Sequence, residues 1–281
     1  MNDTIIVGVT DAAVSQRAID WAVRRAADRG GRVELLSVVG GAIGAVGEDA
    51  VISDALRATE AMLNSKVRDI TADGIEVTTR TEAGNPVAAL IEASRFASLL
   101  VIGSDYRGPH SGPARGAHGV RIAAGAHCPV VVVPDVDAAD DRSGVVVGID
   151  GSPVSEHALR FAAAEADRLR EKLIAVSVWT PVVAPRNDFA VYPDLYLENM
   201  QAATEEVLAL ALAGIASDYP DLEVERVVEQ GYPSQVINAH AQHATLTVVG
   251  THGRGAIARF LLGSISQEVL ARLATVTAVV R

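Results

Sequence analysis

Apolar residues gather in short runs along the chain, and longer amphipathic segments separate these runs. In the second half the runs are rich in β-branched residues, which favours strands. The strands predicted there cover residues 144–149, 173–179, 222–229, 245–250 and 276–280. Largely apolar strands that alternate with helices indicate a parallel sheet covered on both faces.

Helical spacing is clearest in the segment Pro153–Leu169. Its predicted buried face comprises Ala158, Leu159, Phe161, Ala162 and Ala166, while Arg160, Glu165 and Arg168 are expected to face water. A second apolar segment, VLALALAGIA at residues 207–216, is shorter than the roughly 20 residues that a membrane-spanning helix needs. We expect it to form a buried helix face.

The two halves of the chain repeat one pattern. VGVTDAAVSQRAIDWA at residues 7–22 aligns with VGIDGSPVSEHALRFA at residues 147–162, and LLVIG aligns with LTVVG further along. Self-similarity over half a chain indicates two copies of one domain. The acidic stretch DVDAADDRSG is the natural linker. We therefore expect two α/β domains, each with a five-stranded parallel sheet, at residues 1–134 and 144–281, joined by a linker at 135–143.

Charge and cysteine content narrow the classes of partner and compartment. The 281 residues include 24 Lys and Arg against 35 Asp and Glu, a net charge of −11. Nucleic acids and anionic membranes are therefore not expected as partners, because both attract excess positive charge. The single cysteine, Cys128, suits a reducing compartment and is expected to be a small buried thiol. The sequence begins with a strand-like segment rather than an export signal, so we expect a cytoplasmic protein.

Two strand ends in the second half carry the candidate chemistry. In open α/β sheets a ligand usually lies beyond the carboxyl ends of the strands. Asp150 follows the first of these strands, and Ser152 is placed to cap the next helix. The fourth strand is followed by GTHGRGAIARFLLGSI, residues 250–265, in which glycines lead to Ser264 at the start of a helix.

The glycine-rich stretch favours binding of an anion. Glycines let main-chain N–H groups approach a phosphate without a Cβ in the way. The helix that Ser264 opens has free N–H groups and a dipole, worth about 0.3–1 kcal/mol per charge at exposed positions. His252, Arg254 and Arg259 add donors or positive charge. Asp150 is suited to accept a hydrogen bond from a ribose hydroxyl or an adenine amino group. A loop that only lets a helix pack closely is the alternative.

Other motifs do not indicate a catalytic or metal centre. The sequence has no GxxxxGK[ST] pattern, and GTHGRG does not have the GxGxxG spacing of dinucleotide sites. His240 and His243 lie three residues apart on a predicted helix without an obvious third ligand, so we interpret them as exposed histidines rather than metal ligands.

These motifs together resemble those of the universal stress protein family. Its nucleotide-binding members carry G-x2-G-x9-G-[S/T], which this chain matches at Gly250, Gly253, Gly263 and Ser264. They also carry an aspartate after the first strand, matched by Asp150. The resemblance covers nearly the whole chain. It implies two Rossmann-like domains of the adenine nucleotide alpha hydrolase-like type, with strand order 3-2-1-4-5, in a cytoplasmic ATP-binding protein of the stress response.

The resemblance also implies a role for individual residues. Adenine would lie near Asp150 and Val178, with Gly148 at the floor of the pocket. The ribose and phosphates would be held by Gly250, Gly253, Gly263, Ser264 and the main chain of Ile265, and the expected set is completed by Val249 and Arg254. Whether Mg²⁺ accompanies ATP stays open, because no acidic residue in the loop marks a metal position.

The first half departs from the nucleotide motif. Thr10 stands in place of Asp150, Tyr106 in place of Gly253, and Ala117 in place of Ser264. We therefore expect weak nucleotide binding or none in the first domain. The resemblance further implies association through the last, apolar strand of each sheet, which gives pairing of the two domains and a homodimer as hypotheses.

Three functions follow from these observations. The main expectation is a non-catalytic, ATP-dependent regulator that acts on an unidentified protein partner. The second is a slow ATPase with His252 as the candidate base, and the third is an interaction scaffold that binds no nucleotide.

Overall fold

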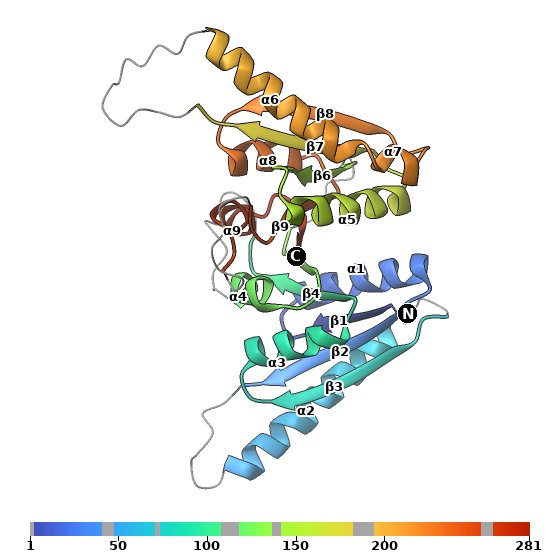
Figure 1. Ribbon diagram of the computed structural model, residues 1–281. Coiled ribbons are helices and arrows are strands. Elements are labelled where there is room, and N and C mark those ends of the chain that lie inside the picture. The colour runs from blue at the N-terminus through green and yellow to red at the C-terminus, as the bar shows by residue number, and fades with distance from the viewer. Residues whose placement is uncertain are drawn as a thin grey trace, which may run out of the picture. The chain divides into compact units, whose positions relative to one another are not determined.

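The structure is a computed structural model that describes residues 3–40, 48–70, 74–107, 118–136, 142–181, 194–253 and 261–281. The chain divides into two compact units, one in each half of the sequence. Each unit is a parallel sheet with helices packed on it (Figure 1).

The first unit has five strands in the order β3-β2-β1-β4-β5. The strands are β1 (Thr4–Gly8), β2 (Arg32–Val39), β3 (Val77–Ala83), β4 (Leu99–Ser104) and β5 (Val130–Pro134). The helices are α1 (Val14–Arg29), α2 (Glu48–Asp69), α3 (Pro86–Ala93) and α4 (His118–Gly125), with a short 3-10 helix, η1 (Ser94–Phe96). All neighbouring strands of this unit pair in parallel.

The second unit repeats this arrangement in the order β8-β7-β6-β9-β10. Its parallel strands are β6 (Val145–Gly148), β7 (Leu173–Trp179), β8 (Val224–Gln230), β9 (Leu246–Gly250) and β10 (Val276–Val280). Its helices are α5 (Pro153–Leu169), α6 (Asp194–Leu212), α7 (Ile215–Asp218), α8 (Pro233–Ala241) and α9 (Ser264–Ala271). In chain order both units read 3-2-1-4-5, so the predicted fold class is confirmed.

The ends of α5 follow from its sequence. Ser152 caps the helix, since its side chain accepts a hydrogen bond from the Ser155 N–H at 3.2 Å. Pro153 takes the first helical position, where its missing N–H costs nothing. The chain leaves the helix at Arg170, which adopts a left-handed conformation with φ of 57°. The predicted segment Pro153–Leu169 is confirmed without a shift at either end.

Some expectations about which residues face solvent were wrong or only half right. Glu165 and Arg168 were expected in water, but Glu165 is fully buried and the side chain of Arg168 is only 11% exposed. Glu165 Oε2 lies 2.9 Å from Nη2 of Arg168, one turn later. The ion pair compensates the buried charge, which the helical period alone does not reveal. In the 207–216 segment Leu208 and Leu212 are buried, whereas Leu210 is 69% exposed, so only one side of this segment enters the core. Of the helices within the described ranges, none is long and apolar enough to cross a membrane.

The topology of the second unit creates a crevice between two strand ends. β6 and β9 are neighbours, and the chain leaves β6 for α5 but leaves β9 for α9. Right-handed crossovers put α5 and α6 over one face of the sheet, and α8 and α9, which pack against each other, over the opposite face (Figure 1). The carboxyl ends of β6 and β9 therefore form the point where a doubly wound sheet usually binds its ligand.

Candidate functional site

A cavity of about 450 Å³ opens at the carboxyl ends of β6 and β9. This volume lies in the range of small-molecule sites, roughly 300–1,000 Å³. The cavity is lined by all the predicted site residues that the structure describes: Gly148, Asp150, Val178, Val249, Gly250, Gly253, Gly263, Ser264 and Ile265. The remaining predicted residue, Arg254, lies outside the described residues, as does Arg259.

Sequence reasoning missed several residues of the cavity wall: Ile149, Ser155, Val176, Pro233, Ile237 and Ser266. Val176 could have been found, because it lies two residues before Val178 and side chains two apart on a strand share a face. Ile237 comes from α8, and no local pattern relates it to the strand ends. An added Cβ at Gly148 would lie 2.8 Å from Ile237 Cδ1, so this glycine makes room for the Ile237 side chain.

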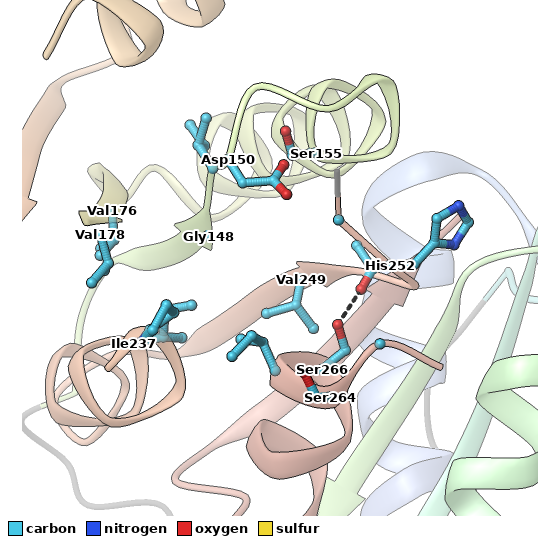
Figure 2. A pocket seen from close by; sticks show the side chains of 16 residues that line it. Gly148, Asp150, Ser155, Val176, Val178, Ile237, Val249, His252, Ser264 and Ser266 are labelled. Atoms are coloured by element: carbon cyan, nitrogen blue, oxygen red, sulfur yellow. Dashed lines mark hydrogen bonds between the residues drawn. The ribbon is translucent and has the colours of Figure 1, made fainter. Parts of the chain in front are cut away.

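The cavity has an apolar end and a polar middle. Figure 2 shows Val176, Val178 and Ile237 together at one end. Asp150 lies on one side of the cavity, and Ser264 lies opposite (Figure 2). An apolar slot beside a single carboxylate and a glycine-rich wall suits a ligand with a flat apolar part and a polar part.

Asp150 is held in place by its own turn. Its Oδ1 accepts a hydrogen bond from the Ser152 N–H at 2.9 Å, and Gly151 has φ of +73°, which lets the chain turn into α5. A Cβ added to Gly253 would lie only 2.3 Å from Asp150 Oδ2. The carboxylate therefore lies directly against the backbone of the glycine loop, and a side chain at position 253 is incompatible with Asp150 in this position.

Gly250 lines the cavity and also makes room for a neighbouring helix. A Cβ at Gly250 would lie 2.8 Å from Val154 Cγ1 at the start of α5. The first unit has the same contact, because a Cβ at Gly103 would lie 2.8 Å from Val14 Cγ1 on α1. This helix contact explains why Gly103 is present in the half that departs from the nucleotide motif. Close helix packing, the alternative interpretation of the glycines, therefore accounts for the missing side chain at this position.

The start of α9 forms another part of the cavity wall. Gly263 is its N-cap residue and has no side chain that could accept from the first-turn N–H groups. Gly263 N donates to Thr251 O at 2.7 Å, and Ser266 Oγ donates to Gly250 O at 2.6 Å, the dashed bond in Figure 2. These bonds fix the helix N-terminus, with its exposed Ser264, beside the end of β9.

The candidate base, His252, lies at the edge of the cavity (Figure 2). Its Nδ1 lies 3.0 Å from the Thr251 hydroxyl oxygen. The histidines weighed as metal ligands behave differently: His240 Nε2 lies 2.7 Å from Glu229 Oε1, and His243 is exposed beyond the end of α8. Among the residues that the structure describes, no three His, Cys, Asp or Glu side chains are grouped to hold a metal ion.

The first unit differs at the corresponding strand ends. The Thr10 N–H donates to Ser15 Oγ at 2.9 Å, and Thr10 Oγ1 accepts from the Ala12 N–H at 3.3 Å. Thr10 therefore makes hydrogen bonds within the turn that leads into α1. Tyr106, at the position of Gly253, is only 5% exposed. Its ring therefore lies within the fold. Ala117, at the position of Ser264, lies outside the described residues.

Comparison with known proteins supplies a family for this arrangement. A model described as the universal stress protein family matches residues 1–134 and 143–281. A universal stress protein of Mycolicibacterium smegmatis is 32% identical over 288 residues, covering 99% of this chain and 96% of that protein. One of Mycobacterium tuberculosis is 31% identical over 292 residues, with 98% and 95% covered. The crystal structure of a universal stress protein from Archaeoglobus fulgidus shares the fold, with a TM-score of 0.72 at 21% identity and 99% and 98% covered.

Proposed function

Because the chain belongs to the universal stress protein family, we propose that its second domain binds ATP without turning it over and that occupancy regulates a protein partner. The observation that carries this proposal is one cavity with an apolar end, a carboxylate and a glycine-rich wall at a helix N-terminus. A nucleotide has matching groups in the same order: a base for the apolar end, a ribose for the carboxylate, and phosphates for the glycine-rich wall.

The apolar end suits the adenine ring. Val176 and Val178 from β7 and Ile237 from α8 offer aliphatic side chains to the faces of a flat ring. Asp150 is an acceptor when ionised, so it matches a donor such as the adenine amino group or a ribose hydroxyl. A hydrogen bond to a charged group is worth about 1.5–3 kcal/mol, enough to orient the nucleotide in the cavity.

The glycine-rich wall suits the phosphates. Gly253 and Gly263 line the cavity, and so do Ser264 and Ile265 in the first turn of α9, where the N–H groups at a helix N-terminus suit a phosphate. The helix dipole adds about 0.3–1 kcal/mol per phosphate charge at exposed positions and up to ~2 kcal/mol where the site is partly buried. Whether Mg²⁺ joins the phosphates is a separate question that a titration with and without EDTA answers.

A regulatory role follows from where the nucleotide would bind. ATP would contact the ends of β6 and β9, α8 and the start of α9 at once, so it would favour conformations in which these elements lie close together. At 100 times its Kd a ligand adds about 2.7 kcal/mol to the stability of the form that binds it. The proposal assigns His252 no catalytic role; its Nδ1 lies 3.0 Å from the Thr251 hydroxyl oxygen. The proposed compartment is the cytoplasm.

The test is nucleotide content together with affinity. The purified chain is denatured and the released nucleotide is quantified by chromatography, and the emptied protein is titrated with ATP by calorimetry. We expect a single ATP site that Asp150→Ala weakens strongly. Thr10→Ala, the same truncation at the corresponding position of the first half, is the matched control and should leave affinity unchanged.

Two results would overturn the proposal. A wild-type protein that carries no nucleotide and shows no heat on ATP titration would leave the interaction scaffold as the function. ATP turnover that disappears in His252→Ala while binding persists would establish the slow ATPase instead.

A further inference from the structure

One carboxylate joins the two helices that form a wall of the cavity. Glu268 lies on α9, and its Oε2 accepts a hydrogen bond from Ser234 Oγ at 2.6 Å. Its Oε1 accepts from the Tyr232 hydroxyl at 3.2 Å. Ser234 is 3% exposed while Glu268 is an exposed residue, so their hydrogen bond is partly buried. We call Tyr232, Ser234 and Glu268 the clamp.

The clamp lies next to residues that line the cavity. Tyr232 and Ser234 flank Pro233, a lining residue at the start of α8. Glu268 comes one turn after Ser264, which lines the cavity from α9. The two hydrogen bonds therefore connect the first turn of α8 to the first turns of α9, and they restrict how far the two helices can separate.

The first unit lacks all three residues of the clamp. The repeat places Asn85, Val87 and Arg121 at the positions of Tyr232, Ser234 and Glu268. Asn85 caps its own helix, since its Oδ1 accepts from the N–H groups of Val87 at 3.0 Å and Ala88 at 3.1 Å. The clamp thus occurs in the half that has the intact nucleotide motif.

Tyr232 replaces a good helix cap. It is the N-cap residue of α8, and within the described part of the chain its side chain makes no capping hydrogen bond. Tyrosine lacks the short oxygen-bearing side chain that capping requires. A residue that is poorly suited to its local position often has a role elsewhere in the structure. Here the Tyr232 hydroxyl donates a hydrogen bond to Glu268 on α9. The hydrogen bond and the negative charge of Glu268 raise the pKa of Tyr232, so the phenol keeps the proton that it donates.

We propose that Glu268 is a positioning residue of the nucleotide site, which, through Tyr232 and Ser234, holds α8 against α9 at the spacing that ATP requires. This inference rests on the proposed function. Without the clamp the first turn of α8 gains conformational freedom, and ATP binding must then order this turn. Such ordering lowers affinity without removing any contact to the ligand.

The experiment compares ATP affinity with stability in the full chain. Glu268→Ala removes both acceptors, and we expect an increase in Kd for ATP of about 10-fold, the scale of one hydrogen bond to a charged group. Glu268→Gln keeps the length of the side chain and an acceptor oxygen, so it should restore part of the affinity. Gln267→Ala, an exposed neighbour on α9 that does not line the cavity, is the matched control.

Two further measurements separate positioning from a general structural role. Urea unfolding without ATP should give nearly the same midpoint for Glu268→Ala and Gln267→Ala. The ultraviolet titration of Tyr232, obtained by subtracting the Tyr232→Phe spectrum, should shift toward the ordinary tyrosine pKa of about 10 in Glu268→Ala.

The outcomes distinguish the inference from the function on which it rests. A wild-type chain that fails to bind ATP overturns both. Wild-type binding with an unchanged Kd in Glu268→Ala overturns the clamp alone. A loss of affinity that is matched by an equal loss of stability without ATP also overturns it, because Glu268 would then only support the fold.

Discussion

Replacing Gly253 by alanine tests how the aspartate and the glycine loop fit together. The added Cβ would lie 2.3 Å from Asp150 Oδ2 and 3.5 Å from Cγ. Ordinary contacts of a Cβ begin near 3.4 Å, so the carboxylate must move by about 1 Å, and misplacement on this scale is costly at a binding site. Because the carboxylate is the far end of an exposed side chain, the fold itself should be little affected.

The expected loss can be stated as a change in affinity. If the shift removes the hydrogen bond between Asp150 and the nucleotide, the cost is that of a bond to a charged group, about 1.5–3 kcal/mol. This corresponds to a rise in Kd for ATP of about 10- to 150-fold. Gly214→Ala is a matched control, because nothing lies within 4 Å of a Cβ added there.

A double-mutant cycle measured by calorimetry tests the mechanism. If the methyl group acts by displacing the carboxylate, Gly253→Ala should cost little affinity once Asp150 is already alanine. Urea unfolding without ATP accompanies each variant, since Asp150→Ala also removes the hydrogen bond from the Ser152 N–H. Equal losses with and without Asp150 would refute the reasoning and show that the glycine meets the ligand directly.

Three further predictions concern packing, capping and the thiol. Gly250→Ala should lower the free energy of unfolding by about 1–3 kcal/mol through overpacking against Val154, and an unchanged urea midpoint would contradict this. Ser152→Ala should cost about 0.5–2 kcal/mol, because the Ser155 N–H loses its acceptor; calorimetric unfolding measures this, and a neutral result would mean another group takes over. Burial raises the pKa of Cys128 to about 12. At pH 8 only about 1 in 10⁴ of the thiol is then ionised, so a thiol reagent should react slowly with folded protein, faster as pH rises and rapidly after unfolding. Rapid labelling of the folded protein at pH 8 would contradict the burial.

The elements of the fold were predictable because they depend on local patterns. The strand predicted at 276–280 has those bounds in the structure, and the strand predicted at 222–229 is displaced by no more than two residues. Glu165 shows the limit of such patterns. Helical periodicity placed it in water, but its burial depends on Arg168 and on the packing around it, which the period does not encode.

The candidate site was predictable at the strand ends and not at its walls. Asp150 and the glycines follow strands, and parallel strands end at the same edge of a sheet, so their proximity follows from topology. Ile237 and Glu268 enter from helices, and their neighbours depend on how α8 and α9 pack.

The sequence by itself determined the duplication, the succession of strands and helices along the chain, and the half that carries the intact nucleotide motif. Spacing along a chain fixes these features, because secondary structure has short, regular periods. Only the tertiary structure decided what each glycine does: Gly250 makes room for α5, whereas Gly253 makes room for the carboxylate of Asp150. It also brought together Tyr232 and Glu268, 36 residues apart. Contacts of this kind depend on distances across the fold, and close packing sets those distances to fractions of an ångström.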